Sequence, residues 1–444
     1  MPWKKCEKVF HAVENSMIPG KCIWKPVVQK AVTGHARRFR MVPGEPRWPK
    51  RLVAPGLYLH IPFCKNLCPY CPYNRVEYEE SLFAAYARAV QQEIDLYAPH
   101  LQGRTFTSLY VGGGTPTVNW PGLVSILDHL RARLGGLPDV CVELHPASMD
   151  DACLRALKDA GATSLSIGVE SASDAVLQRI GRSHDRHTAL DAVERALRIG
   201  FGSINVDLMF ALPGQSAADW RDDVQTLVGL GIDQLSTYPL FAFPYSDDGR
   251  ERRLRDVARP PHALVKGMLD FTDAHCESRG LARCAVWSWL RPGKHKFSSI
   301  TRHHYIGFGP SAASMTGTDF TVNTFDVRAY AETLPARRPV AVAMPLDRRL
   351  EMAYWLYWRI YELKILDADF RAVFGPDASL DAEFGRLLRP LLWTRLLERV
   401  PGGYRVTRPG AYWIHRLQNE YSLSYINRLW GTCRRAPWPR EVRL

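Results

Sequence analysis

The chain lacks any run of 18 or more apolar residues, so a helix that spans a membrane is not expected among its 444 residues. Its first ten residues are basic, but no apolar segment of the kind found in signal peptides follows them. The ten cysteines are scattered and do not form the framework of a small disulfide-bonded domain. We therefore expect a cytoplasmic protein with reduced thiols.

Acidic residues are scarce at both ends of the chain. Residues 1–52 contain twelve Lys and Arg against three Asp and Glu, and residues 395–444 contain ten against three. Such basic surfaces attract anionic ligands or acidic protein partners. The chain shows no zinc finger, no RNP motif and no compact basic helix, so nucleic-acid binding is not expected.

Three of the cysteines, Cys64, Cys68 and Cys71, stand close together after a short apolar stretch. Thiolates at this spacing, on a loop that contains Pro and Asn, can converge on one face of an iron–sulfur cluster. Three protein ligands leave one iron open to another ligand. The alternatives are a zinc knuckle and three unrelated core cysteines. Structural zinc sites use four ligands, and no second cysteine pair lies within reach, so the spacing favours the cluster.

From residue 57 onward, short apolar runs alternate with longer helical patterns. The predicted strands cover 57–62, 107–112, 139–144, 163–168, 203–208 and 234–239. The predicted helices cover 78–98, 119–134, 150–160, 173–199, 216–230 and 261–279. This alternation predicts an α/β fold with a parallel sheet and right-handed crossovers. Six such units form a partial (β/α)6, TIM-like barrel, whose site is expected at the C-terminal ends of its strands.

The regions on either side of this barrel differ from it in composition. We expect a basic N-terminal arm over 1–52, the barrel over 53–335, and a mostly helical, winged-helix-like cap over 336–444. Aromatic and Arg residues interleave over 421–438. They could bind a planar or anionic ligand or seal the cap against the barrel, and the seal is the favoured interpretation.

Several further motifs fall at the predicted strand ends. Residues 110–117 read Tyr-Val-Gly-Gly-Gly-Thr-Pro-Thr, and glycines here let the backbone approach a ligand closely, while their amides can bind a carboxylate. Glu143 follows at the third strand. The stretches 166–171, 178–182 and 205–215 end the series, and Tyr305-Ile-Gly-Phe-Gly-Pro-Ser-Ala-Ala-Ser314 comes after the barrel.

The C-x3-C-x2-C spacing resembles the signature of radical S-adenosylmethionine (radical SAM) enzymes. In these the open iron is chelated by S-adenosylmethionine, whose reductive cleavage yields a 5′-deoxyadenosyl radical. The order of the other motifs, from about residue 55 to about 410, resembles the HemN-like family. That family includes oxygen-independent coproporphyrinogen dehydrogenases, heme chaperones and class C radical methyltransferases, and it often binds two S-adenosylmethionine molecules.

The resemblance implies roles for individual residues. A [4Fe–4S] cluster would be bound by the three cysteines. The cofactor-binding candidates are Tyr58, Tyr70, Gly113, Gly114, Thr115, Glu143, Arg182 and Asp207, and the catalytic candidates are His60 and Glu170. For His60, a second-shell or core position remains the alternative to proton transfer. A flavodoxin- or ferredoxin-type protein would donate electrons.

The chain also departs from the family. Tyr73 stands where the coproporphyrinogen dehydrogenases have an extra cysteine, and Glu170 stands where they have glutamine. Their substrate-contacting Tyr-Thr-Ser-Tyr-Pro segment has no counterpart in residues 1–52. The chaperones carry a histidine where this chain has Ala312-Ala313. We therefore expect methylene transfer from a second S-adenosylmethionine to an sp² carbon of a small molecule or tetrapyrrole. Oxidative decarboxylation of a porphyrinogen and heme chaperoning are the alternatives.

Overall fold

The computed structural model describes residues 39–45, 47–48, 52, 54–212, 214–240, 246, 261–298 and 303–444. Most of the predicted N-terminal arm, including residues 1–38, therefore lies outside the described residues. In the described part of the chain, none of the helices combines the length and apolar character that crossing a bilayer needs.

Six parallel strands form the centre of the structure, in the same order in space as in the sequence. They are β2 (Gly56–Ile61), β5 (Leu109–Gly113), β6 (Val140–Leu144), β7 (Ser164–Glu170), β8 (Ser203–Phe210) and β9 (Gln234–Pro239). Their side chains are mostly buried, as expected for strands covered on both faces. The predicted fold class, a partial barrel of the radical SAM type with a C-terminal, mostly helical part, is confirmed.

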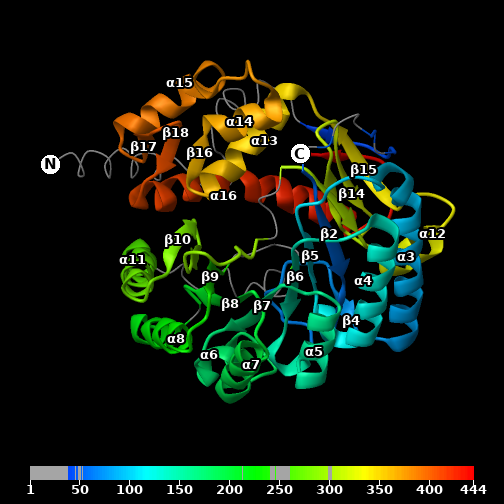
Figure 1. Ribbon diagram of the computed structural model, residues 1–444, viewed down its shortest axis with the longest axis horizontal. Coiled ribbons are helices and arrows are strands. Elements are labelled where there is room, and N and C mark those ends of the chain that lie inside the picture. Colours follow the sequence, from blue (N-terminus) through cyan, green and yellow to red (C-terminus); the bar gives the residue numbers. More distant parts are fainter. Residues whose placement is uncertain are drawn as a thin grey trace. The chain divides into compact units, whose positions relative to one another are not determined.

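Helices connect these strands and lie on the outer side of the curved sheet (Figure 1). They are α3 (Glu80–Leu101), α4 (Trp120–Leu134), α5 (Asp151–Asp159), α6 (Asp174–Arg179), α7 (Arg186–Ile199), α8 (Ala217–Gly229) and α11 (His262–Ser278). Asp150, Asp185 and Ser216 cap the first turns of α5, α7 and α8 with side-chain oxygens. These three helices therefore begin at residues of the types that favour a helix N-terminus.

The predicted single helix over 173–199 is two helices, α6 and α7. Gly181 breaks it with a φ of 72°, a conformation that glycine adopts without steric cost. The break places Arg182 in the loop between the two helices, and this loop faces the cysteine loop: a Cβ on Gly181 would lie 3.0 Å from Pro69.

The sheet extends beyond the six strands on both sides, to twelve strands in all among the described residues. Beyond β2 lie β12 (Tyr305–Phe308), β13 (Ala313–Met315), β14 (Asp319–Asn323) and β15 (Val340–Pro345), and beyond β9 lie β11 (Ser288–Leu290) and β10 (Ala282–Ala285). Strand β12 is parallel to β2, and the others pair antiparallel. The helix α12 (Val327–Thr333) joins β14 to β15.

Two short pairings involve only two residues from each strand. Strand β3 (Phe63–Cys64) pairs with β4 (Val76–Glu77) across the cysteine loop. Strand β1 (Arg40–Met41) pairs with β19 (Val442–Arg443). The first of these pairings closes the loop that carries the cysteines.

The chain divides into two compact units. The barrel unit comprises Met41–Pro345 together with Asn427–Val442. The second unit is formed chiefly by Leu346–Ile426 and contains α13 (Arg348–Tyr361), β16 (Lys364–Leu366), α14 (Asp367–Phe374), α15 (Leu380–Trp393), β17 (Leu397–Val400), β18 (Gly403–Val406) and most of α16 (Arg408–Cys433). The predicted domain limits at residues 52 and 335 stay predictions.

The second unit has its own hydrophobic core. Trp355 from α13, Phe370 from α14 and Phe384 from α15 are buried in it, and the Trp355 and Phe370 rings lie 5.1 Å apart. The three short strands form one antiparallel sheet in the order β16-β18-β17. Three complete helices, most of a fourth and a small three-stranded sheet match the mostly helical, winged-helix-like arrangement expected from the sequence.

Candidate functional site

The three cysteines lie on the loop that follows β2. Cys64 is buried, while Cys68 and Cys71 are partly exposed, and all three are free thiols. The backbone N–H of Cys71 donates to the carbonyl of Cys68 over 3.2 Å. The guanidinium of Arg75 donates to the carbonyls of Cys68 and Cys71. These contacts fold the loop back on itself so that Cys68 and Cys71 share one short turn.

The groups around the sulfur atoms suit an iron–sulfur cluster. Thr115 Oγ1 donates to Cys64 Sγ over 3.7 Å, and Arg182 Nη1 donates to Cys68 Sγ over 3.7 Å. Hydrogen bonds to the sulfurs are one way in which proteins adjust a cluster. Burial raises the pKa of Cys64, and it raises the pKa of Cys71 to about 12. Metal binding would therefore have to displace protons from these thiols.

The spacing of the three sulfurs does not suit one small ion. Within the described residues, these sulfurs do not form a group whose ligand atoms all lie within 4.8 Å of one another. Ligands bound about 2.3 Å from a tetrahedral zinc ion lie about 4 Å apart. The described geometry therefore gives no support to the zinc knuckle.

The glycine stretch after β5 lies directly against the cysteine loop. A Cβ on Gly114 would lie 2.9 Å from Cys64 Sγ and 2.6 Å from the carbonyl of Phe63. Gly113 has a φ of 123°, and its N–H donates to Glu143 Oε2 over 3.1 Å. Glycine is needed here because the backbone passes closer to the cysteine loop than any side chain would allow.

Three carboxylates occupy neighbouring strands at their C-terminal halves. Glu143 lies on β6, Glu170 ends β7 and Asp207 lies on β8. Burial raises the pKa of all three, and that of Asp207 to about 7. The charges also oppose one another, since Glu170 and Glu143 both raise the pKa of Asp207. This acidic wall, Glu143–Glu170–Asp207, would be stabilised by a ligand with positive charge.

Asp207 is held by neutral donors from the adjacent strands. Ser166 Oγ donates to it over 2.6 Å, and Asn205 Nδ2 donates over 3.0 Å. Asn205 in turn accepts from Ser236 Oγ over 2.8 Å. No cation faces Asp207 among these partners, so its carboxylate is positioned but not neutralised.

Glu170 and Arg182 connect the acidic wall to the cysteine loop. Glu170 has a φ of 68°, next to a β-bulge between Gly168 and Glu170. A left-handed backbone at a non-glycine residue is strained, and such strain often lies at functional sites. Arg182 Nη1 lies 3.8 Å from Glu170 Oε1, and Arg182 also donates to Cys68 Sγ. Burial opposes the charge of Arg182, but the anionic groups around it raise its pKa overall.

His60 has both ring nitrogens engaged. Tyr58 OH lies 2.8 Å from Nδ1, and the carbonyl of Asn74 lies 2.9 Å from Nε2. Burial lowers the pKa of His60 to about 4. A neutral ring with Nε2–H donating and Nδ1 accepting satisfies both contacts. This geometry favours a positioning role over proton transfer, and the catalytic role of His60 stays a prediction.

The two tyrosines of the cysteine loop lie in different surroundings. Tyr70 is 9% exposed and packs with Val176, Ile180, Met209 and Leu212, so its ring is largely covered. Tyr73 is 52% exposed. Tyr73, which the sequence singled out as a departure from the dehydrogenases, is therefore the more accessible ring beside the cysteines.

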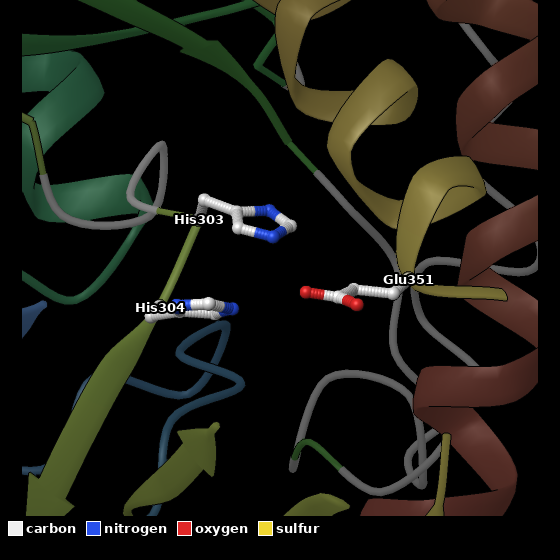
Figure 2. A group of neighbouring side chains, drawn as sticks. All are labelled: His303, His304 and Glu351. Atoms are coloured by element: carbon white, nitrogen blue, oxygen red, sulfur yellow. The ribbon is translucent and has the colours of Figure 1, made fainter. Parts of the chain in front are cut away.

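Two histidines lie next to each other just before β12. The rings of His303 and His304, both drawn in Figure 2, have centroids 4.3 Å apart. Glu351, also drawn there, lies on α13 in the second unit. The sequence did not single out this pair, because two adjacent histidines carry no characteristic spacing.

Several residues of the site were missed from the sequence. Tyr110 donates its hydroxyl to Glu143 and lies 5.0 Å from Phe297 between ring centroids. Asn205 had an available signal, since it lies two residues before Asp207 and therefore on the same face of β8. Arg75, which binds two carbonyls of the loop, had no such signal.

Comparison with known proteins gives consistent matches. Residues 58–227 match the family model described as the radical SAM superfamily. The chain is 31% identical to a heme chaperone HemW of Mycobacterium tuberculosis, over 64% of this chain and 76% of the relative. It is 25% identical to the oxygen-independent coproporphyrinogen III oxidase of Escherichia coli, over 84% and 85%. The solved structure of coproporphyrinogen III oxidase (HemN) from Escherichia coli superposes with a TM-score of 0.69 at 23% identity, over 85% of this chain and 90% of that one.

These matches change the order of the sequence-based hypotheses. The expected closeness to radical methyltransferases is not supported, and relatives named heme chaperone HemW favour the chaperone alternative. The sequence misjudged this because the motifs at the strand ends serve the shared cofactor, whereas differences of substrate lie outside them.

Proposed function

Because the chain belongs to the HemN-like family of radical SAM proteins, we propose that it binds a [4Fe–4S] cluster through Cys64, Cys68 and Cys71, and that its cargo or substrate is heme or a related tetrapyrrole. The observation that carries the first part is the pair of donors, Thr115 and Arg182, on two of the three cysteine sulfurs. When bound, the cluster supplies one-electron reduction to S-adenosylmethionine. A flavodoxin- or ferredoxin-type protein is the proposed electron source.

The acidic wall is the proposed site of S-adenosylmethionine. The sulfonium of this cofactor is a cation, and it would relieve the repulsion among Glu143, Glu170 and Asp207. Arg182 lies between Glu170 and Cys68 and presents a planar fork that suits a carboxylate. Gly113 and Gly114 let the cofactor approach the backbone. A second S-adenosylmethionine is proposed on the same wall, which a measured stoichiometry near two would support.

The tetrapyrrole part of the proposal rests on the relatives named heme chaperone HemW. Heme carries two propionates, so the acidic wall itself would repel them. The tetrapyrrole is therefore proposed to lie away from the wall. Ala312 and Ala313 offer no axial ligand where the chaperones carry a histidine, so any ligating side chain in this protein must come from elsewhere.

Anaerobic product analysis tests the proposal. The protein is reconstituted with iron and sulfide, reduced, and given S-adenosylmethionine with and without heme. We expect about four irons per chain, slow release of 5′-deoxyadenosine, and a heme absorbance band that titrates to saturation. Cys68→Ala should lose iron, whereas the buried Cys153→Ala, which lies on α5 away from the loop, should keep it. A Cys68→Ala protein with full iron content would refute the cluster assignment.

The second candidate is oxidative decarboxylation of a porphyrinogen. It is favoured by the alignment with the coproporphyrinogen III oxidase, which spans 84% of this chain. Tyr73 in place of the extra cysteine argues against it. Carbon dioxide release from coproporphyrinogen III would support this candidate, and heme retention without decarboxylation would support the chaperone. Formation of S-adenosylhomocysteine would instead restore methyl transfer.

A further inference from the structure

Residues near the C-terminal end pack on the loop that carries the cysteines. The segment Asn427–Val442 belongs to the barrel unit, although Leu346–Ile426 separates it from the rest of that unit in sequence. It comprises about the last two turns of α16 and the residues that follow. We call it the tail segment. None of the family motifs above lies in it.

Arg434 is the polar contact of the tail segment with the loop. Its Nη2 donates to the carbonyl of Pro72 over 2.8 Å and to the carbonyl of Tyr73 over 2.7 Å. Pro72 directly follows the third cysteine, Cys71. One guanidinium nitrogen thus fixes two successive peptide units next to the proposed cluster. Hydrogen bonds from a charged donor are among the stronger ones in proteins.

Aromatic contacts reinforce this attachment. The ring of Trp430 lies 6.2 Å from that of Tyr73 and 6.0 Å from that of Phe325, between centroids. Asn74 Nδ2 donates to the carbonyl of Phe325 over 2.7 Å, and the carbonyl of Asn74 is bonded by His60. Pro72, Tyr73 and Asn74 are therefore each held by groups from outside the loop.

We propose that the tail segment clamps the cysteine loop and that Arg434 is a positioning residue for the cluster, through its two bonds to the carbonyls of Pro72 and Tyr73. The clamp fixes the path of the chain that leaves Cys71 and sets the direction in which the exposed Tyr73 ring points. It also places a permanent positive charge beside the loop, and the charge near a cluster is one determinant of its reduction potential. The role in the cluster rests on the proposed function above, whereas the clamp itself does not.

Hydrogen–deuterium exchange on the metal-free protein tests the clamp. Arg434→Gln removes the charge and most of the donor reach, and Arg434→Lys keeps the charge on a shorter side chain, which places its donor farther from the two carbonyls. In Arg434→Gln, amides of the peptide 68–78 should exchange about tenfold faster, the effect expected for losing a hydrogen bond to a charged group. Arg434→Lys should fall between this variant and the wild type. Equal protection of the loop in all three proteins would overturn the clamp.

The neighbouring Arg435→Gln is the matched control. Arg435 is exposed, and its Nη2 donates to Thr432 Oγ1 over 3.5 Å within the tail segment. Arg435→Gln should leave hydrogen–deuterium exchange in the peptide 68–78 unchanged, although it removes the same positive charge as Arg434→Gln. If Arg435→Gln accelerated exchange as much as Arg434→Gln, the effect would be one of general charge or stability, and the assignment of Arg434 would fail.

Measurements on the cluster-loaded protein separate positioning from simple tail attachment. The midpoint potential of the cluster should move to more negative values in Arg434→Gln and stay near the wild-type value in Arg434→Lys, because only the former loses the charge. Trp430→Ala should loosen the loop without this shift. A potential unchanged in Arg434→Gln would reject the cluster role and leave the clamp standing. Absence of iron from the wild-type protein would instead reject the proposed function.

Discussion

Asp207 should make cofactor binding depend on pH around neutrality. Its carboxyl group lies within the barrel, bonded by Ser166 and Asn205, and burial raises its pKa from 3.8 to about 7. At pH 6 only about a tenth of a group with this pKa is ionised, and at pH 8 about nine tenths is. If the ionised form binds the cationic cofactor, the apparent Kd for S-adenosylmethionine should fall about tenfold between pH 6 and pH 8, or about 1.4 kcal/mol.

The sign of the effect is fixed by the direction of the shift. The pKa of Asp207 in the folded protein lies above its unfolded value, so the ligand-free fold favours the neutral acid. The stability contributed by this group is therefore present below pH 3.8 and is lost as the pH rises through about 7. The affinity for S-adenosylmethionine should rise over the same pH range, because the cationic ligand compensates the carboxylate charge of Asp207 that folding buries.

Calorimetry on the anaerobic, cluster-loaded protein at pH 6, 7 and 8 measures the effect. The amino group of the cofactor also titrates in this range, so the comparison is between the wild type and Asp207→Asn. The variant keeps the shape but not the charge. It should bind about 10- to 100-fold more weakly at pH 8 and lose the part of the pH dependence that belongs to Asp207.

The exposed Asp128→Asn on α4 is the control, and it should behave as the wild type at every pH. Iron content per chain must be equal in all three proteins for the comparison to hold. If Asp207→Asn kept the affinity and the whole pH dependence of the wild type, Asp207 would not contact the cofactor, and the acidic wall would lose its proposed role.

Three further predictions follow from contacts described by the structure. Gly114→Ala should lower the iron bound per chain, since its Cβ would lie 2.9 Å from Cys64 Sγ, while Gly136→Ala, with no atom within 4 Å, should not; equal loading would contradict the close approach. Arg182→Ala should weaken S-adenosylmethionine binding at least tenfold in calorimetry with iron content preserved, and an unchanged affinity would argue against its cofactor role. Burial raises the pKa of Glu93 from 4.5 to about 7, so the fold should lose on the order of 3 kcal/mol of stability as the pH rises from 4.5 to above 7. Urea unfolding should show this loss with pH in the wild type but not in Glu93→Gln, and the same pH dependence in both proteins would refute the prediction.

The six parallel strands could be predicted because each is a short apolar run followed by a helical pattern. Residues 234–239, for example, were predicted as a strand and are one, β9. The flanking strands could not be predicted in the same way. Strands β11 and β13 have three residues each, too few for a pattern, and β12 is interrupted by Gly307. Gly307 is required because a Cβ there would lie 2.3 Å from the carbonyl of Ala313, a contact that forms only when the chain turns back after β12 and that the apolar pattern does not show.

The candidate site divides in the same manner. The cysteines were predicted from their spacing, Glu143, Glu170 and Asp207 from motifs at strand ends, and Arg182 from the resemblance to the HemN-like family. Arg75 and Arg434 were missed because each acts on backbone carbonyls, and any residue type supplies a carbonyl. The bond from Arg434 to the carbonyl of Pro72 joins residues 362 positions apart, and neither residue belongs to a sequence pattern that would indicate it.

The discontinuity of the barrel unit has a consequence for biosynthesis. The cysteine loop is translated long before Arg434, and at about 5–20 residues per second the interval is roughly 20–70 s. During that time the barrel of Met41–Pro345 can begin to fold on the ribosome, but the carbonyls of Pro72 and Tyr73 have no guanidinium to meet. A nascent chain truncated before residue 427 would therefore expose its cysteines on an unsecured loop. Iron and sulfide that are delivered after translation, and not during it, would reach a cysteine loop that Arg434 already holds in place.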